Sequence, residues 1–116
     1  TIAFSWLKTY PNHPSKMVFG VGYYTKSNME ICLLGTYGNA RTLIKNNTIS
    51  QVIVSPRYKH SEKPKEVRNK IIQLCGDIPR IELFARGEVN GWDVWGNNCE
   101  DKFNLFKIKR GKSNDR

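Results

Sequence analysis

The stretch PKEVRNKIIQLCG, residues 64 to 76, repeats its apolar residues with the period of an α-helix. Four of them occupy one stripe of such a helix, at i, i+4, i+7 and i+8: Val67, Ile71, Leu74 and Cys75. Pro64 suits the first turn, Glu66 complements the positive N-terminal dipole, and Gly76 favours a left-handed C-cap. The sequence therefore predicts an amphipathic helix that begins at Pro64 and ends before Gly76.

Strand-like runs flank this helix on both sides. QVIVS (51–55) precedes it and is stopped by Pro56, and RIELFAR (80–86) follows it. Alternation within 80–86 predicts two faces, one with Ile81, Leu83 and Ala85 and the other with Glu82, Phe84 and Arg86. The order strand, helix, strand predicts an α/β sheet with a crossover helix, right-handed if the two strands are parallel.

The remaining segments are predicted from composition and period. Three further runs read as strands: TIAFSWLK (1–8), MEICLLGTYG (29–38), which is apolar enough to be buried, and WDVWGNN (92–98), with a polar end. Two prolines predict a loop at TYPNHPSK (9–16), and MVFGVGYYTKSN (17–28) fits no regular period, which predicts an irregular loop. Residues 39–50 form a polar connector, and FNLFKIK (103–109) is a candidate edge strand.

Composition limits the class of protein. A chain of 116 residues is one domain or part of one, and an apolar fraction of 39% argues against wholesale disorder. Nineteen Lys and Arg against ten Asp and Glu leave a formal charge of +9. That excess favours a polyanionic partner such as nucleic acid, and a merely soluble basic domain is the alternative.

The cysteine pattern bears on the compartment and on metal binding. Cys32, Cys75 and Cys99 are odd in number and stand outside any CxxC pattern, so we expect reduced thiols in a cytoplasmic protein. With His13 and His60 as the two histidines, no metal-ligand cluster is visible and no metal site is predicted. No apolar run approaches the ~20 residues of a membrane span, so no membrane partner is expected.

RGEVNGWDVWGNN (86–98) combines two tryptophans, three glycines and three asparagines. Such a mixture suggests backbone folded tightly around a ligand with a flat face and hydrogen-bonding edges. In open α/β sheets ligands lie beyond the carboxyl ends of the strands, which is where this stretch falls. For Trp92 and Trp95, packing is favoured over stacking against a ligand.

Four stretches together resemble one known family: FSWLKT (4–9), VGYYTKSNMEICLLGTYGN (21–39), SPRYKHSEKPKEV (55–67) and RIELFARGEVNGWDVWGNN (80–98). In order and spacing they are similar to the MT-A70 family of adenine-N6 methyltransferases, especially the short bacterial and phage forms. The resemblance covers residues 1–98 as part of one methyltransferase domain and leaves 99–116 as a basic tail. It implies an incomplete Rossmann-like, S-adenosylmethionine-dependent methyltransferase sheet.

The resemblance implies a set of cofactor residues. By likeness to the family, S-adenosylmethionine would be bound by Lys63, Glu82, Phe84, Arg86, Asn97 and Asn98. Phe84 would form an apolar wall, Glu82 and Arg86 would hydrogen-bond the cofactor, and Gly96 would allow close backbone approach. The alternatives are ordinary solvated strand residues for Glu82 and Arg86, and a turn cap for the paired asparagines.

A second implied set faces the substrate: Tyr23, Tyr24, Lys26, Asn28 and Glu30. Glu30 aligns with an acidic residue of the family's acceptor cavity, and the other four would hold a displaced base and its phosphates. An adenine in a duplex must be flipped out before its amine can be reached. The alternative for Tyr23 and Tyr24 is that they staple the loop to the core.

The family's catalytic signature, Asp-Pro-Pro-Trp, does not occur in the sequence. No catalytic residue is therefore assigned, and we expect a C-terminal portion whose missing part is cleaved, disordered or on another chain. Without the family's central strands the chain should form two half-sheets with exposed apolar edges. The predicted function is adenine-N6 methylation of DNA, with RNA less favoured. The alternatives are an inactive nucleic-acid-binding subunit of a methyltransferase complex, or a basic domain that shares only the fold.

Overall fold

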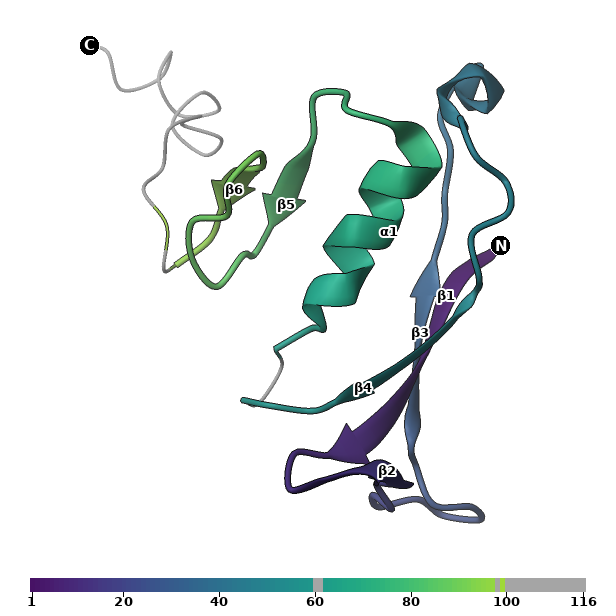
Figure 1. Cartoon of the computed structure of the whole chain (residues 1–116), viewed down its shortest axis with the longest axis vertical. Helices are drawn as coiled ribbons and strands as arrows, with labels where there is room; N and C mark the ends of the chain where they lie inside the picture. Colours follow the sequence, from purple (N-terminus) through teal and green to yellow (C-terminus); the bar gives the residue numbers. More distant parts are fainter. Residues whose placement is uncertain (60–61, 98, 100–116) are drawn as a thin grey trace, which may run out of the picture. The chain divides into compact units, whose positions relative to one another are not determined.

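A computed structural model describes residues 1–59, 62–97 and 99 (Figure 1). The chain divides into two compact units, Thr1–Ile78 and Pro79–Arg116. The described part of the first unit contains a four-stranded sheet and that of the second a two-stranded sheet. Two separate sheets agree with the expected half-sheets. Asn98 and the candidate strand at 103–109 lie outside the described residues.

The central strand of the first unit is β1 (Ile2–Tyr10). It pairs antiparallel with β2 (His13–Met17) and β3 (Met29–Leu33), and parallel with β4 (Val52–Pro56). A short 3-10 helix, η1 (Ala40–Leu43), lies in the predicted polar connector between β3 and β4. The predicted strands at 1–8 and 51–55 are therefore confirmed, and β4 ends at Pro56 as expected.

The loop predicted over residues 9–16 is wrong. β1 continues to Tyr10, and after a tight turn at Pro11 the chain returns as β2, with Thr9 opposite Met17. Pro14 lies within β2 because every residue of that strand is exposed, and an edge strand tolerates a residue that cannot donate a ladder hydrogen bond. The irregular loop predicted after it is confirmed from Val18 to Asn28.

The prediction of a buried strand over residues 29–38 is wrong in extent and in burial. β3 ends at Leu33, and its apolar residues alternate with half-buried Glu30 and Cys32. Leu33 is 75% exposed and Ile31 49% exposed. These side chains share one sheet face, which no described element of the first unit covers.

The core of the first unit lies on the opposite face. Phe4 and Trp6 of β1 and Ile53 of β4 are buried there, and Val67 and Ile71 pack against them. The last two belong to α1 (Lys65–Cys75), which lies across this face of the sheet in Figure 1. The prediction of a packed stripe is therefore confirmed for Val67 and Ile71.

The ends of α1 follow the predicted signals. Pro64 is the N-cap, Glu66 lies in the first turn, and the Gly76 N–H donates a 2.7 Å hydrogen bond to the Ile72 carbonyl. Gly76 has a φ of 79°, where a side chain would be strained, so glycine suits this end. Its ψ of −173° is extended, so the predicted left-handed cap is confirmed in φ alone.

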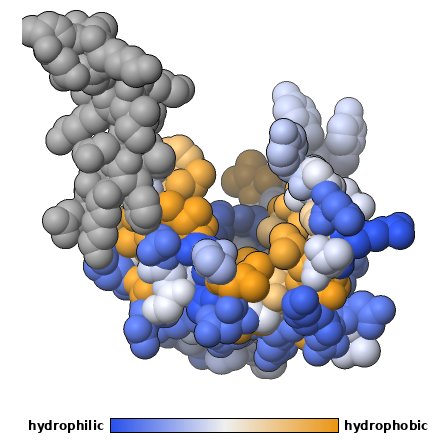
Figure 2. Space-filling view, turned by 90° about the horizontal axis from the view of Figure 1, so that it is seen from above, coloured by the Kyte–Doolittle hydropathy of each residue, from blue (hydrophilic) through white to orange (hydrophobic). Residues whose placement is uncertain are grey.

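The uncovered face is strongly apolar. Register places Ile31 and Val52 opposite Ser5, and Met29 and Val54 opposite Leu7, all on one side of the sheet. We call the exposed residues on this side the apolar face: Met29, Ile31, Leu33, Val52 and Val54, which are 44 to 75% exposed. Apolar residues (orange) also reach the surface in the view of Figure 2. Exposed patches of this kind mark interaction sites.

The second unit contains β5 (Ile81–Leu83) paired parallel with β6 (Asp93–Trp95). β6 confirms the predicted short strand within 92–98. The strand predicted over 80–86 is shorter than expected, because Phe84 has a φ of 60° and turns the chain away after Leu83. β4 and β5 belong to different sheets, so the prediction that α1 is a crossover within one sheet is also wrong.

Within the described ranges, no helix has both the length and the apolar character of a membrane span.

Replacing Ile53 by alanine tests the assignment of the core. Ile53 is 3% exposed, so we expect Ile53→Ala to lower the free energy of unfolding by about 2–5 kcal/mol. Val54 is the next residue along the strand and points to the other face, where it is 58% exposed. Val54→Ala should therefore change the free energy of unfolding by about 0.5 kcal/mol or less. Urea denaturation measures both, and equal losses would contradict the assignment of faces.

Candidate functional site

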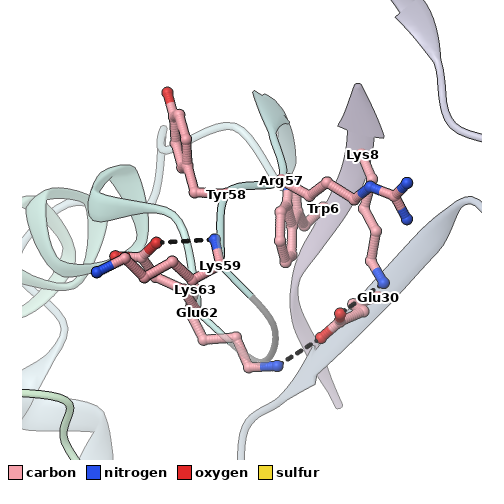
Figure 3. Close-up of a pocket in the computed structure, with 8 residues that line it drawn as sticks. All are labelled: Trp6, Lys8, Glu30, Arg57, Tyr58, Lys59, Glu62 and Lys63. Carbon is pink, nitrogen blue, oxygen red and sulfur yellow. Dashed lines mark hydrogen bonds and ion pairs between the residues drawn. The ribbon is translucent and has the colours of Figure 1, made fainter. Parts of the chain in front are cut away.

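A cavity of about 430 Å³ opens in the first unit beside Glu30 (Figure 3). Eight residues from β1, β3 and the segment between β4 and α1 line it: Trp6, Lys8, Glu30, Arg57, Tyr58, Lys59, Glu62 and Lys63. The lining carries four basic and two acidic side chains. The cavity is therefore net positive and suits a ligand with hydrogen-bonding edges and negative charge nearby.

Glu30 holds two lysines in this cavity. Its Oε2 accepts from the Lys8 ammonium at 2.6 Å, and its Oε1 accepts from the Lys63 ammonium at 2.8 Å. Figure 3 shows both lysines converging on the carboxylate from different elements. The structure thus brings together Glu30, predicted to face the substrate, and Lys63, predicted to bind the cofactor.

Strand geometry explains why these groups meet. Glu30 of β3 stands opposite Trp6 of β1, and Lys8, two residues along β1, points to the same face. Lys63 precedes the buried Pro64 at the start of α1, which packs over that face. The ion pairs therefore tie the beginning of the helix to two neighbouring strands.

The charge state of Glu30 follows from this arrangement. Partial burial raises the pKa of the carboxyl, but the hydrogen bonds and positive charges of Lys63 and Lys8 outweigh it, so the pKa lies below its ordinary value. Glu30 is accordingly an anion at neutral pH. Its side chain is 37% exposed, so an entering ligand reaches it.

Trp6 gives the cavity a fixed aromatic wall. The indole Nε1 donates a 2.8 Å buried hydrogen bond to the Ser55 carbonyl, which holds the ring in place. The Lys8 ammonium lies 5.5 Å from the ring centroid, within cation–π range. Sequence reasoning assigned no role to Trp6, Lys8 or Arg57. Alternation along β1 was the available signal, since it predicts that Trp6 and Lys8 share a face.

A second, mainly apolar cavity of about 230 Å³ adjoins the first. Trp6, Glu30 and Lys63 line both, so they form a common wall. Phe4, Ile53 and Val67 contribute apolar surface to the second cavity. Together the two cavities combine a polar rim with apolar surface, as small-molecule sites commonly do.

The other predicted substrate residues do not line the polar cavity. Tyr23 and Tyr24 are 100% and 98% exposed, so the alternative that they staple the loop to the core is wrong. Lys26 is exposed as well. Asn28 is half-buried, and its backbone carbonyl accepts a 3.0 Å hydrogen bond from the Lys8 N–H.

The second unit places its predicted cofactor residues at the carboxyl ends of two parallel strands. Glu82 is half-buried on β5, Phe84 and Arg86 follow that strand, and Asn97 follows β6. Arg86 and Asn97 are exposed. Asn98 lies outside the described residues, so its predicted role stays a prediction.

Phe84 is the strained residue of this group. Its φ of 60° is rare for an aromatic residue and costs about 1–3 kcal/mol, which the surrounding contacts have to offset. The ring is 76% exposed and meets the edge of Trp95, with centroids 5.2 Å apart and planes at 77°. The apolar wall predicted for this ring stays a prediction. The guanidinium carbon of Arg80 lies over the Trp92 ring, 5.5 Å from the ring centroid.

Gly96 lets the chain after β6 approach the backbone after β5 closely, while the approach to a ligand predicted for it stays a prediction. A methyl group at this position would lie 2.6 Å from the Ala85 carbonyl oxygen and 2.9 Å from the Ala85 nitrogen. The Ala85 N–H also donates to the Trp95 carbonyl at 2.9 Å. The turns after both strands are therefore pressed together, which brings Phe84 and Asn97 to one edge of the sheet.

The described residues contain no group of three or more His, Cys, Asp or Glu arranged to hold a metal ion. Cys32, Cys75 and Cys99 are free thiols.

Comparison with known proteins places the chain in a class. The profile of the MT-A70 family matches residues 2–98, and the chain belongs to that family. Among its relatives is Type II methyltransferase M.MunI from Mycoplasma sp, 36% identical over 101 residues. The matched region covers 87% of this chain and 40% of the relative, so the chain spans about two fifths of that protein's length.

The ion pairs of Lys8 and Lys63 with Glu30 predict how Glu30 titrates. Because the folded pKa lies below the unfolded one, the ion pairs stabilise the fold above the unfolded pKa, and this contribution is lost as pH falls through the folded pKa. Lys63→Met and Lys8→Met should each raise the pKa of Glu30. NMR of the Glu30 carboxyl carbon measures this pKa. Lys59→Met is the control, because Lys59 lines the same cavity but its backbone N–H donates to Glu62 and not to Glu30.

Gly96→Ala should separate the two turns of the second unit. The added methyl group meets backbone atoms, so we expect a loss of about 1–3 kcal/mol in the free energy of unfolding. Gly87→Ala is the matched control, since open space surrounds that position, and it should change stability by about 0.5 kcal/mol or less. Thermal unfolding of both variants checks this, and an unchanged Gly96→Ala variant would refute the close approach.

Proposed function

We propose that the chain is part of an S-adenosylmethionine-dependent methyltransferase that modifies the N6 amine of adenine in DNA. Membership of the MT-A70 family supports the reaction class. The proposal of adenine as the substrate rests mainly on one observation, the cavity in which Lys8 and Lys63 converge on Glu30 beside Trp6. A Type II methyltransferase among the relatives supports DNA as the substrate and a role in restriction–modification.

The cavity matches the edges of adenine. The base donates through its N6 amine and accepts at its ring nitrogens. The Glu30 carboxylate accepts from the amine, while the lysine ammonium groups donate to ring nitrogens. The indole of Trp6 and the adjoining apolar cavity receive the flat face. Methyl transfer forms a bond from N6 to the methyl carbon as the carbon–sulfur bond breaks, and N6 releases a proton to solvent.

The residues of the second unit fit the cofactor. S-adenosylmethionine supplies an electrophilic methyl group on a positively charged sulfur. The exposed, strained ring of Phe84 offers an apolar wall for the adenosine. Glu82 accepts from ribose hydroxyls, and Arg86 and Asn97 hydrogen-bond the polar groups. The role of Lys63 toward the cofactor rests on the resemblance, since its ammonium is bonded to Glu30.

A further segment has to complete the enzyme. The sequence lacks the Asp-Pro-Pro-Trp tetrapeptide, and we infer that another segment or chain supplies it. The apolar face supports this inference, because an exposed apolar patch of this kind marks a surface that another segment or chain covers. An inactive nucleic-acid-binding subunit is the alternative function, and it requires neither cofactor binding nor methyl transfer.

The full-length protein should bind S-adenosylmethionine and methylate adenine in DNA. Arg86→Ala and Asn97→Ala should each weaken cofactor binding by about tenfold, from the loss of one hydrogen bond to a charged or polar group. Glu30→Gln should leave cofactor binding intact and lower kcat/KM by roughly ten- to a hundredfold. Calorimetry measures the first effect and mass spectrometry of digested DNA the second.

Two exposed positions supply the controls for this experiment. Arg41→Ala on η1 should leave cofactor binding unchanged, and Glu66→Gln on α1 should leave methylation unchanged. Binding of the cofactor without any methylation would favour the inactive subunit. Failure to bind it at all would indicate that only the fold is shared.

A further inference from the structure

The loop from Val18 to Asn28 is held at both ends by one residue. The Val18 N–H donates to the Lys8 carbonyl at 3.0 Å, and the Lys8 N–H donates to the Asn28 carbonyl at 3.0 Å. Val18 is 2% exposed and anchors the first end. Because the Lys8 side chain lines the polar cavity, the loop rises from the rim of that cavity.

A second closure tightens the loop. The Gly20 N–H donates a 2.7 Å hydrogen bond to the Ser27 carbonyl. A methyl group at Gly22 would lie 1.8 Å from the Thr25 carbonyl oxygen, so only glycine fits this turn. The loop is thus cross-braced, and its tip is displayed without folding back on the sheet.

The tip presents aromatic surface to solvent. Tyr23 is 100% exposed, Tyr24 98% and Val21 95%. The two tyrosine rings lie 6.1 Å apart at 39°, so they touch but do not stack face to face. Each ring therefore keeps a face for another flat group. Exposing such residues on a braced loop has no benefit for the fold, which indicates a binding role.

The charge around the loop favours an anionic partner. No acidic residue precedes Glu30 in the sequence, whereas Lys16 and Lys26 flank the tyrosines and are exposed. Aromatic faces between lysines suit the bases and phosphates of nucleic acid.

We propose that Tyr23 and Tyr24 form a stacking wedge that contacts the bases flanking the target adenine, rather than the adenine itself. This inference rests on the proposed function, because it requires a displaced base in the polar cavity. Neither tyrosine belongs to the residues that line that cavity. The wedge occupies the stack beside the vacated position, and Lys26 contacts the neighbouring phosphate.

Binding of the full-length protein to DNA tests the wedge without requiring methyl transfer. Fluorescence anisotropy compares a matched duplex with one in which the target adenine is mispaired. Tyr23→Ala/Tyr24→Ala should weaken binding to both by about tenfold, in line with the loss of base stacking. Tyr23→Phe/Tyr24→Phe keeps the rings and should bind as the wild type does. Lys26→Ala should lower the slope of log affinity against log salt by about 1.

Tyr37→Ala is the matched control, because Tyr37 is 100% exposed on a different loop and should not affect binding. Loss of affinity in the phenylalanine variant would overturn stacking in favour of the hydroxyl groups. Unchanged affinity in the alanine variant would overturn the wedge, even if methylation and cofactor binding confirm the proposed function. A change in oligomeric state without a change in DNA affinity would likewise overturn it and assign the loop to protein contact.

Discussion

The alternation of side chains along β1 is the constraint on which the rest of the first unit depends. Phe4, Trp6 and Lys8 point to one face because successive strand residues point to opposite faces. The first two meet α1 and build the core, while Lys8, one step further along, reaches the cavity beside Glu30. Core and site are therefore continuous, and the burial that folds the strand also places its charged end.

Glu30 joins this face to the start of α1. A carboxylate between two ammonium groups stays ionised at neutral pH and holds Lys63 against the sheet. Fixing two flexible lysine side chains costs conformational entropy, so these partly exposed pairs add little to stability. Electrostatic preorganisation of this kind, rather than stability, is the main consequence of the partly exposed pairs.

The apolar face shows the opposite situation. Met29, Ile31, Leu33, Val52 and Val54 obey the same alternation, yet nothing in the described part of the first unit covers them. Exposed apolar patches of this kind mark interaction surfaces.

How much the sequence predicts differs from element to element. The helix at 65–75 follows from its own stripe and caps, and the strands predicted at 1–8 and 51–55 follow from alternation and apolar composition, because these signals are local. The hairpin through Pro14 was missed, since only an edge position makes proline acceptable. The family resemblance marked Glu30, Lys63 and Phe84. The tertiary structure alone decided that Glu30 bonds both lysines and that Phe84 turns out of its strand, because those outcomes depend on neighbours remote in the chain.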